Sequence, residues 1–410
     1  MEQPDTSLIL VINCGSSSLK YEVYTMPEKK SLGKGKVERI GLEKGRIEQK
    51  KDGILYEREV PVPDHKVAFE AVVEALTDRE KGIIGSTDDI DAIGHRVVHG
   101  GESYSESVLI DNSVKRAIQA YFELAPLHNP ANLTGIHEAE KQFPGVKNVA
   151  VFDTAFHQTM PPSAYLYGIP RELYRKYKIR RYGFHGTSHR YVSNRALDLL
   201  KRSKDNTNLI TCHLGNGASI TAIERGRSVD TSMGFTPLEG VIMGTRSGDL
   251  DPAIITFLIE RGYDADEVNT LLNKKSGLLG LSELSSDMRD IKNARADGNV
   301  KARETLEVYA YRIKKYIGAY MANLVKVDAM VFTGGIGENN ADIRHEICHR
   351  LENIGIVIDD EKNNAVGNGE EGIISADYSP SSILVVPTNE ELQIAVDTYK
   401  IAFGIETTEV

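Results

Sequence analysis

The sequence predicts an α/β protein built from two related domains, and three observations support this. An apolar strand, a turn of glycine and small polar residues, and a returning strand occupy residues 8–24, and the same pattern recurs at residues 209–223. Strand-like apolar runs alternate with helical periodicity along the rest of the chain. The chain has 410 residues, more than a single core usually accommodates. Two sheets are therefore expected.

The remaining elements follow from the spacing of apolar residues. Short apolar runs bounded by turn residues predict strands at residues 90–98, 147–152, 329–333 and 382–386. Apolar residues recurring every three or four positions predict helices at residues 67–76, 114–122, 252–261, 301–325, 343–354 and 391–403. We expect the last helix to return to the first domain. The first domain is then predicted to comprise residues 1–154 and 389–410, and the second residues 155–388.

Composition excludes several classes of protein. The chain is 40% hydrophobic and 26% charged, which is typical of soluble globular proteins. Its net charge of −10 argues against a nucleic-acid partner, and the basic stretch at residues 171–190 is interpreted as a solvated face. The apolar run at residues 8–12 is too short to cross a bilayer, so no membrane association is expected. Three scattered cysteines favour a reducing, cytoplasmic location.

Two motifs match known patterns without the context that their chemistry requires. Residues 345–349 match the HExxH pattern of zinc proteases, but no third-ligand pattern follows. Both histidines of this motif fall opposite an apolar stripe, so we expect them to face water. The stripe consists of Ile343, Ile347, Leu351 and Ile354. Residues 367–372 match the dinucleotide pattern GxGxxG, but they place two glutamates where a pyrophosphate would bind. We interpret them as a surface loop.

Two further histidine pairs are spaced four residues apart. His95 and His99 lie in a predicted strand, where residues four apart are separated by about 13 Å and do not share a metal ion. Between His185 and His189, Gly186 makes a helix doubtful. Neither pair therefore predicts a metal site.

Three glycine-containing segments are suited to binding phosphate. Residues 13–20 place three serines and a glycine on a turn between strands, where successive N–H groups form an anion-binding concavity, and Lys20 adds a positive charge. A plain serine-rich hairpin is the alternative. Residues 215–217 form a second such turn. Residues 333–339 run from a strand through glycines into a helix N-terminus, which permits close approach by a nucleotide.

Two arginines and one aspartate complete the candidate site. Arg96 and Arg246 lie among glycines, where a guanidinium group suits a carboxylate or a phosphoryl group. Asp153 follows a predicted strand, which is a common catalytic or metal-binding position in α/β folds. Its alternative role is as the N-cap of a helix.

Taken together, these segments resemble the acetate kinase family, within the superfamily of acetate and sugar kinases, Hsp70 and actin. The matching segments are residues 11–21, 94–101, 125–133, 149–158, 181–189, 213–219, 233–250, 334–339 and 387–391, in family order. The resemblance implies the two-domain actin-like ATPase fold, with duplicated βββαβαβα domains around a central cleft. It also implies a homodimer that transfers a phosphoryl group from ATP to acetate with Mg²⁺ or Mn²⁺.

The resemblance also implies a role for each matching residue. The catalytic residues are Arg96, Asp153, His185 and Arg246. The acid's methyl group meets Val98, Leu127, Phe184 and Pro237, with Arg96 beside it. ATP contacts Asn13, Ser16, Ser18, Lys20, His128, His213, Asn216, Gly217, Asp287, Arg289, Gly335, Ile336 and Asn339, and the metal is held by Asn13 and Glu390. One departure is Met288, where the family often has phenylalanine beside the adenine.

The chemistry of the acceptor explains the abundance of cationic residues. A small carboxylic acid is ionised at pH 7 and needs no general base, so the enzyme must bring two anions together and stabilise an in-line transfer. Direct transfer without a phosphoenzyme is the expected mechanism. A propionate or butyrate kinase and a pyrophosphate-linked enzyme are the nearest alternatives. A chaperone-type ATPase or a filament protein would need an additional domain or inserts that this chain has no room for.

Overall fold

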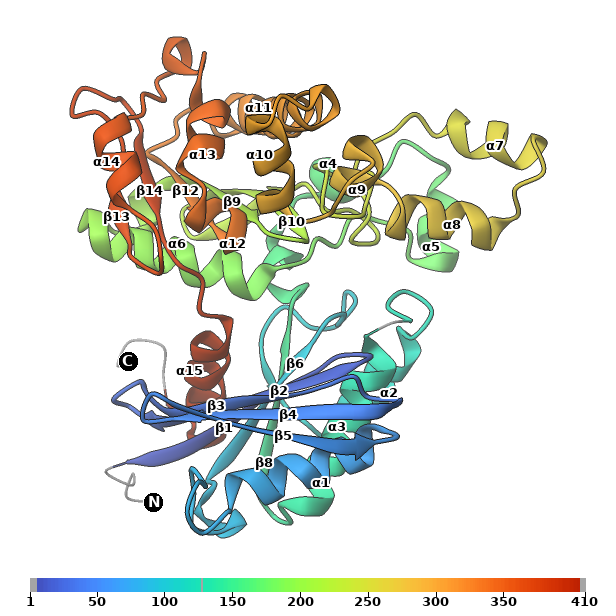
Figure 1. Cartoon of the computed structure of the whole chain (residues 1–410), viewed down its shortest axis with the longest axis vertical. Coiled ribbons are helices and arrows are strands. Elements are labelled where there is room, and N and C mark those ends of the chain that lie inside the picture. The colour runs from blue at the N-terminus through green and yellow to red at the C-terminus, as the bar shows by residue number, and fades with distance from the viewer. Residues whose placement is uncertain (1–5, 127, 406–410) are drawn as a thin grey trace. The chain divides into compact units, whose positions relative to one another are not determined.

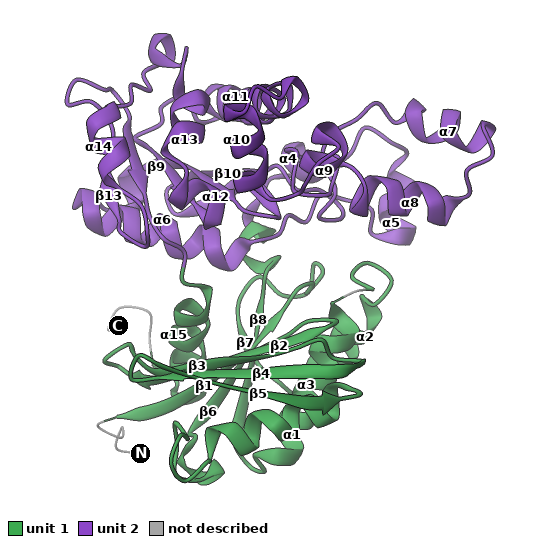
Figure 2. Ribbon diagram, in the orientation of Figure 1, with its two compact units in different colours: residues 1–158, 389–410 green, residues 159–388 purple. Residues whose placement is uncertain are grey.

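The computed structural model describes residues 6–126 and 128–405, and these divide into two compact units. The first unit comprises Met1–Gln158 together with Asn389–Val410, and the second comprises Thr159–Thr388 (Figure 2). Each unit contains one sheet with helices packed against it.

In its described part, the first unit contains an eight-stranded sheet of order β5-β4-β3-β2-β1-β6-β8-β7 (Figure 1). The strands are β1 (Ser7–Cys14), β2 (Ser18–Met26), β3 (Lys30–Glu38), β4 (Leu42–Lys51), β5 (Ile54–Val62), β6 (Ala92–Val97), β7 (Val108–Leu109) and β8 (Lys147–Phe152). Strands β1 to β5 form an antiparallel meander, whereas β1, β6 and β8 are parallel. The carboxyl ends of these three parallel strands therefore lie at one edge of the sheet.

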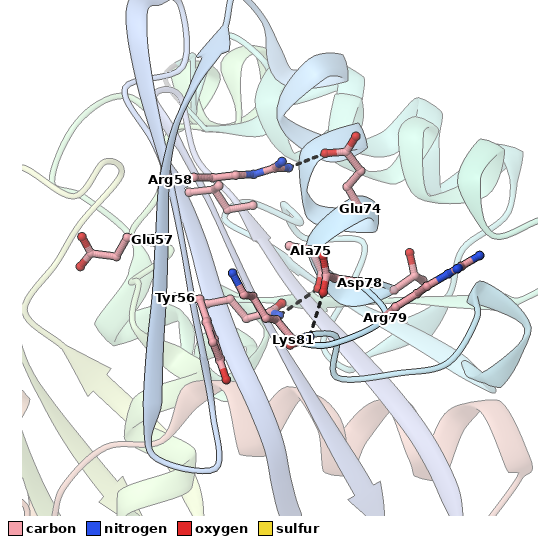
Figure 3. Close-up of a pocket in the computed structure, with 11 residues that line it drawn as sticks. Tyr56, Glu57, Arg58, Glu74, Ala75, Asp78, Arg79 and Lys81 are labelled. Carbon is pink, nitrogen blue, oxygen red and sulfur yellow. Dashed lines mark hydrogen bonds and ion pairs between the residues drawn. The ribbon is translucent and has the colours of Figure 1, made fainter.

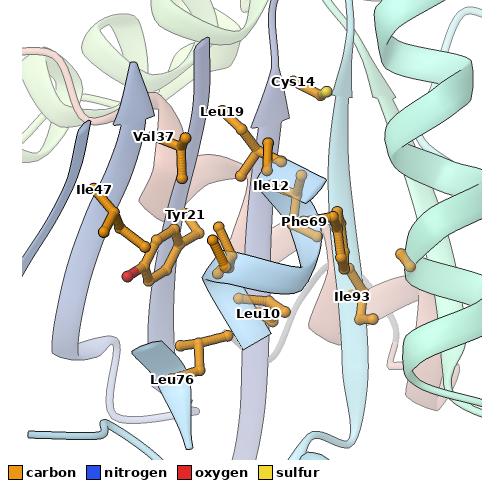
Figure 4. Packing of buried hydrophobic residues seen from close by; sticks show 14 of the residues in the cluster. Leu10, Ile12, Cys14, Leu19, Tyr21, Val37, Ile47, Phe69, Leu76 and Ile93 are labelled. Atoms are coloured by element: carbon orange, nitrogen blue, oxygen red, sulfur yellow. The ribbon is translucent and has the colours of Figure 1, made fainter. Parts of the chain in front are cut away.

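Alternate residues of β1 point to opposite faces of this sheet. Leu10 and Ile12 pack with the core beneath α1 (His65–Leu76) and α3 (Asn129–Gln142), as Figure 4 shows for α1. Ile9 and Val11 instead pack with residues of α15 (Glu390–Phe403). The last helix of the chain therefore covers one face of the first sheet.

The second unit contains, among its residues, a six-stranded sheet of order β11-β10-β9-β12-β14-β13. The strands are β9 (Asn208–Leu214), β10 (Ala218–Glu224), β11 (Arg227–Thr231), β12 (Ala329–Thr333), β13 (Gly372–Ile373) and β14 (Ser382–Val385). Helix α6 (Gly186–Leu200) packs on β9 and β12, and α11 (Val300–Leu324) packs on β9 and β10. The shorter helices are α2 (Asn112–Ala120), α4 (Pro162–Tyr165), α5 (Arg171–Tyr177), α7 (Ala253–Glu260), α8 (Ala265–Lys274), α9 (Gly277–Ser282), α10 (Met288–Ala296), α12 (Gly334–Asn339), α13 (Ala341–Cys348) and α14 (Asp360–Ala365).

The two sheets share one central topology. The order β3-β2-β1-β6-β8 in the first unit corresponds to β11-β10-β9-β12-β14 in the second. In both, the first two connections are antiparallel hairpins and the last two strands run parallel to the first. The predicted duplication is confirmed by this correspondence.

Most predicted elements lie within two residues of the observed ones. One prediction was wrong: the helix expected to reach Ile354 ends at Cys348, and Ile354 is 38% exposed rather than buried. A second was wrong at Gly186, where α6 begins although a helix seemed doubtful. None of the helices in the described ranges combines the length and apolar character needed to cross a bilayer.

Candidate active site

The first unit brings Arg96, Asp153 and Glu390 together. Arg96 lies near the end of β6 and Asp153 directly follows the neighbouring parallel strand β8, so both lie at the same edge of the sheet. Glu390 begins α15. The Nε atom of Arg96 donates to both oxygens of Asp153 at 3.2 and 3.1 Å, and Nη2 donates at 2.6 Å. Its Nε atom also lies 3.7 Å from Glu390 Oε2.

The pKa values of Glu390 and Arg96 are both shifted by burial and by the charges of this cluster. Burial raises the pKa of Glu390 to about 7, with Arg96 opposing and Asp153 reinforcing the shift. Burial alone would lower the pKa of Arg96, but the adjacent carboxylates Asp153 and Glu390 raise it above its ordinary value. Arg96 therefore stays charged, whereas Glu390 titrates near neutral pH.

Asn13 of β1 shares with Ile9 and Val11 the face of the sheet that α15 covers. Asn13 faces Lys20 directly across the β1–β2 hairpin, and the N–H of Gly15 donates to the carbonyl of Ser18 at 2.8 Å. Ser16 in the turn is exposed. Lys20 is close enough to Glu390 to lower its pKa slightly against the effect of burial. The turn thus presents polar groups beside the carboxylate cluster.

The other predicted residues of the first unit lie nearby in sequence or structure. Val98 is buried, and its N–H donates to Asn132 Oδ1 at 3.1 Å. His128 is the partly buried N-cap of α3. Leu127 lies outside the described residues.

In the second unit, two stacked imidazole rings face a glycine turn. His185 is the N-cap of α6, and His213 lies on β9 with its ring centroid 4.3 Å from that of His185. A Cβ atom added to Gly217 would stand 3.3 Å from His185 Nε2, and one added to Gly215 would stand 3.9 Å from His213 Nε2. The absence of side chains at 215 and 217 therefore leaves space directly beside both rings.

Arg246 lies at the same turn. Its Nη1 atom would stand 3.7 Å from a Cβ atom at Gly217, and it donates to the carbonyl of Pro237 at 3.3 Å. Among the described residues it contacts no carboxylate. Burial lowers its pKa below the ordinary value for arginine. Phe184, the residue before His185, is buried.

A pocket of about 530 Å³ adjoins this turn within the second unit. It is lined by Gly215, Asn216, Ser286, Asp287, Met288, Arg289, Gly335, Ile336, Asn339 and Asn340. Arg289 donates from Nε and Nη2 to the carboxylate of Asp287, at 3.1 and 2.6 Å for the shorter contacts. Hydrogen bonds from Arg289 lower the pKa of Asp287 to about 2. Of the residues expected to contact ATP, this pocket gathers Asn216, Asp287, Arg289, Gly335, Ile336 and Asn339, and Met288 lies beside them.

Gly334 allows the chain to make the turn that borders this pocket. Gly334 has a φ of +76°, and a Cβ atom there would meet the carbonyl oxygen of Leu214 at 2.7 Å. Its N–H donates to Glu338 Oε1 at 2.8 Å, and that oxygen also accepts from the N–H of Thr388 at 3.0 Å. Glu338 thus fixes the strand-to-helix turn of β12 and α12.

A second pocket, of about 580 Å³, lies between β5 and the end of α1 in the first unit (Figure 3). Arg58 is paired with Glu74 across it, and the carboxylate of Asp78 accepts from the N–H groups of Glu80 and Lys81. None of the predicted site residues lines this pocket. Its lining charges are largely compensated by one another.

The HExxH and GxGxxG motifs, at residues 345–349 and 367–372, lie at the surface of the second unit. His345 Nδ1 is hydrogen-bonded to Asp360 Oδ1 at 2.7 Å, and His349 is exposed. Residues 367–371 form a loop, and Gly372, the last residue of the motif, begins β13. Within residues 6–126 and 128–405, no group of three or more His, Cys, Asp or Glu side chains is arranged to hold a metal ion.

One interpretation of the basic stretch was wrong. Arg180 is 5% exposed, and Arg181 donates from Nη1 to the carbonyls of Thr231 and Ser232 and from Nη2 to Glu239. Arg180 is therefore buried and Arg181 fixes the chain at residues 231–232, so neither belongs to a solvated face.

Sequence reasoning also missed the polar side chains that support the histidines. Ser219, Ser188 and His189 are buried beside His185 and His213. The four-residue spacing of the two histidines in 185–189 was the available signal, because on a helix it places both on one face. Nothing in the sequence singled out the serines.

Comparisons with known proteins show the family to which the chain belongs. The family model described as the acetokinase family matches residues 8–396. Acetate kinases of Methanosarcina mazei and Thermotoga maritima are each 55% identical over 395 residues; the alignments cover 96% of this chain and 96% and 98% of theirs. The crystal structure of Porphyromonas gingivalis acetate kinase matches with a TM-score of 0.93 and 48% identity, covering 96% of this chain and 99% of that one. A propionate kinase structure from Francisella tularensis matches with a TM-score of 0.90 and 44% identity, covering 96% and 100%.

Fold and site together define a phosphotransferase of the actin-like ATPase class with a carboxyl group as acceptor. The chain belongs to the acetokinase family.

Proposed function

We propose that this chain transfers the γ-phosphoryl group of ATP reversibly to acetate, giving acetyl phosphate and ADP. The observation that carries the proposal lies within the second unit. A pocket of nucleotide size adjoins the turn at Gly215 and Gly217. Both His185 and the guanidinium group of Arg246, which contacts no carboxylate among the described residues, face that turn. This is the arrangement of donors that a phosphoryl group in transfer requires.

The residues divide the work between binding and charge stabilisation. The 530 Å³ pocket holds adenosine, with Met288 and Ile336 among its apolar walls and Asp287 and Arg289 at its rim. The turn at 215–217 and the serine-containing turn at 15–18 donate backbone N–H groups to the phosphates, with Lys20, His128 and His213 as side-chain donors. His185 and Arg246 neutralise charge on the transferring group, and Arg96 binds the carboxylate of the acceptor.

Transfer is direct, without a phosphorylated enzyme. Both oxygens of Asp153 accept hydrogen bonds from Arg96, which makes this carboxylate a poor nucleophile. Asp153 instead orients Arg96. Inversion of configuration at a chiral γ-phosphorus supports this step, whereas retention contradicts it.

The residues of the first unit fit a magnesium ion. Mg²⁺ keeps several waters and substrate phosphate oxygens and takes only one or two protein carboxylates. Glu390 supplies one such carboxylate, and the amide oxygen of Asn13 is a second hard donor on the same face of the sheet. Bound to ATP, the ion neutralises charge on the phosphates. The raised pKa of Glu390 indicates a carboxylate that gains from a nearby cation.

Acetate is proposed as the preferred acid, with propionate as the alternative. Val98, Leu127, Phe184 and Pro237 are proposed to surround the methyl group. One methylene in an apolar pocket changes binding by about 1–3 kcal/mol, so activity with propionate is expected to be weaker but measurable. The test is to trap acyl phosphate as hydroxamate with ATP and acetate, propionate, butyrate or no acid. The absence of hydroxamate with every acid would reject the function.

The same assay tests the pocket. Replacing Val98 with Ala is expected to raise the ratio of propionate to acetate activity, because the branched side chain limits the length of the acid. An unchanged ratio would remove Val98 from the pocket.

A cytoplasmic homodimer is also proposed. Helix α7 has no buried residue although it is mostly apolar, and Ile254, Phe257 and Ile259 are 45–53% exposed. Such a helix is stabilised when a second copy of the chain covers it. The three cysteines are buried and unpaired, as in a reducing compartment. Sedimentation of the native protein and of the F257E variant tests the dimer. The native protein is expected to sediment as a dimer and the F257E variant as a monomer. A dimer mass for both would place the interface elsewhere, and a monomer mass for the native protein would reject the dimer.

A further inference from the structure

Polar side chains gather on one face of the second sheet, where the surrounding core is apolar. Thr211 and His213 lie on this face of β9, and Ser219 of β10 stands directly opposite His213. The first turn of α6 lies over them. Because residues at helical positions i and i+4 share a face, His185 and His189 both point to the sheet.

These side chains form a continuous chain of hydrogen bonds. Thr211 Oγ1 lies 2.7 Å from His189 Nδ1, and His189 Nε2 lies 2.7 Å from Ser219 Oγ. Ser219 Oγ lies 2.8 Å from His185 Nδ1. The other ring nitrogen of His185 faces Gly217. His189, Ser219 and His185 therefore connect the buried Thr211 to the ring nitrogen that faces the proposed phosphoryl position.

The single hydroxyl proton of Ser219 couples the tautomers of His185 and His189, so all the hydrogen bonds in the series run in one direction or all run in the other. The hydroxyl of Ser219 carries one proton but contacts two ring nitrogens, so it donates to one and accepts from the other. When Thr211 donates to His189 Nδ1, the proton of His189 is on Nε2 and is donated to Ser219. Ser219 then donates to His185 Nδ1, and the proton of neutral His185 is on Nε2.

The opposite polarity has two disadvantages. His185 would donate from Nδ1 and present a bare, electron-rich Nε2 to an anionic phosphoryl group. The hydroxyl proton of Thr211 would also lose its partner, and a buried donor without an acceptor costs about 1–3 kcal/mol. Thr211 is fully buried and makes no other side-chain hydrogen bond with a described residue.

We propose that Ser219, His189 and Thr211 are positioning residues that hold His185 in the tautomer with its proton on Nε2. This inference rests on the proposed function, in which His185 donates to the transferring phosphoryl group. None of the three residues needs to touch substrate. They act by deciding which nitrogen of His185 is the donor.

A second, shorter chain has the same form. Thr388 Oγ1 lies 2.7 Å from Ser188 Oγ, which lies 2.8 Å from His213 Nδ1. The Nε2 atom of His213 faces Gly215. Each of the two stacked rings therefore has a serine at Nδ1 and a glycine of the turn at Nε2. Both histidines are therefore fixed in the same way, by a serine hydroxyl at Nδ1 that leaves Nε2 facing the turn.

The decisive variant is Thr211→Val, which keeps the side-chain shape and removes the hydroxyl donor. His189 and Ser219 separate this donor from His185 in the series of hydrogen bonds. The matched control is Thr221→Val, on the strand opposite. Thr221 is equally buried and is hydrogen-bonded to Thr231, outside the chain of interest. Both variants lose one buried hydrogen bond. A difference in activity between them therefore reflects the changed hydrogen bonding of His185 and not a general loss of stability.

We expect kcat of Thr211→Val to fall on the order of 10-fold relative to Thr221→Val, by analogy with residues that orient metal-bound histidines. KM should stay the same, as for an interaction made only in the transition state. Ser219→Ala should lose more activity, and Ser219→Thr should recover it because the hydroxyl returns. Equal kcat in Thr211→Val and Thr221→Val would overturn the proposal.

The tautomer itself is measured on the native protein without substrate. Nitrogen-15 shifts of labelled histidines distinguish a protonated from a bare ring nitrogen, and His185→Gln assigns the signal. A proton on Nε2 of His185 supports the inference even if no acid gives hydroxamate, in which case only the proposed function is rejected. A proton on Nδ1 alone in an active enzyme overturns the inference and leaves the function standing.

Discussion

Arg96 donates from Nε and Nη2 to Asp153, a carboxylate whose side chain is only 1% exposed. The pair joins the ends of two parallel strands, and Glu390 approaches the same guanidinium group from α15. Arg96 is thereby fixed at a single orientation while 22% of its side chain stays exposed. A fixed but accessible guanidinium group is what recognition of a carboxylate requires.

Replacing Asp153 with Asn is expected to reduce both stability and activity. The buried partner of Arg96 loses its charge, which costs about 3 kcal/mol for a buried pair, and Arg96 is no longer held in place. Hydroxamate formation should fall at least about 100-fold, the scale of a misplaced catalytic group. The control is Asp328→Asn, which removes another buried, arginine-paired carboxylate. It should lose stability but keep kcat, and equal kcat losses would contradict a role for Asp153.

Replacing Arg246 with Ala is expected to separate activity from stability. Arg246 has no carboxylate partner among the described residues, and burial lowers its pKa. The folded protein therefore gains little from this charge, so Tm should stay the same or rise. Formation of acyl phosphate should fall on the order of 10³-fold, as for the loss of an arginine finger. A large drop in Tm together with unchanged turnover would contradict this role.

The raised pKa of Glu390 predicts a pH-dependent stability. Its pKa is about 7 in the folded state, against an ordinary value of 4.5. Because the folded state binds the proton more tightly, the stabilising contribution of Glu390 is full below pH 4.5 and is lost as the pH rises to about 7. Relative to Glu390→Gln, the native protein should lose on the order of 3 kcal/mol across this range.

Denaturant unfolding at several pH values measures that difference. The difference should become constant above about pH 8, once Glu390 is ionised. A difference that does not vary with pH would show that Glu390 has an ordinary pKa. In activity assays, Glu390→Gln should also raise the Mg²⁺ concentration required for half-maximal turnover.

Replacing Gly217 with Ala is expected to block the site. The added Cβ atom would stand 3.3 Å from His185 Nε2 and 3.7 Å from Arg246 Nη1, in the space assigned to the phosphoryl group. Activity should fall on the order of 100-fold, the scale of a small misplacement of reacting groups. The matched control is Gly318→Ala on α11, where a Cβ atom meets nothing within 4 Å. That variant should keep its activity and gain about 1 kcal/mol of stability.

The central topology was predictable because its elements have strong apolar patterns. Strands β8 and β12 begin and end at the predicted residues, since buried residues fill positions 148–152 and 329–333 without interruption. Strands β3 to β5 were not predicted. Charged and exposed residues dominate them. They are held mainly by pairing with one another, and β3 joins them to β2. Such edge hairpins lack the pattern that sequence reasoning relies on.

The candidate residues were predictable only where glycines or strand ends mark them. Arg96, Asp153, Gly217 and the pocket at Gly335 all have such neighbours in the sequence. Ser219 has none, because its importance comes from two histidines that approach it from another element. Arg181 was misjudged for the same reason: its partners are carbonyls about 50 residues away. Convergence of distant segments is a tertiary property.

The return of α15 to the first sheet affects the order in which the protein is made and folds. The face that carries Ile9 and Val11 stays open to water until Ile394 and Tyr399 have been synthesised. At 5–20 residues per second, that exposure lasts roughly 20–80 seconds on the ribosome. The nascent chain therefore exposes an apolar surface during most of its translation. Shortening the last helix should prolong the binding of newly synthesised chains to chaperones.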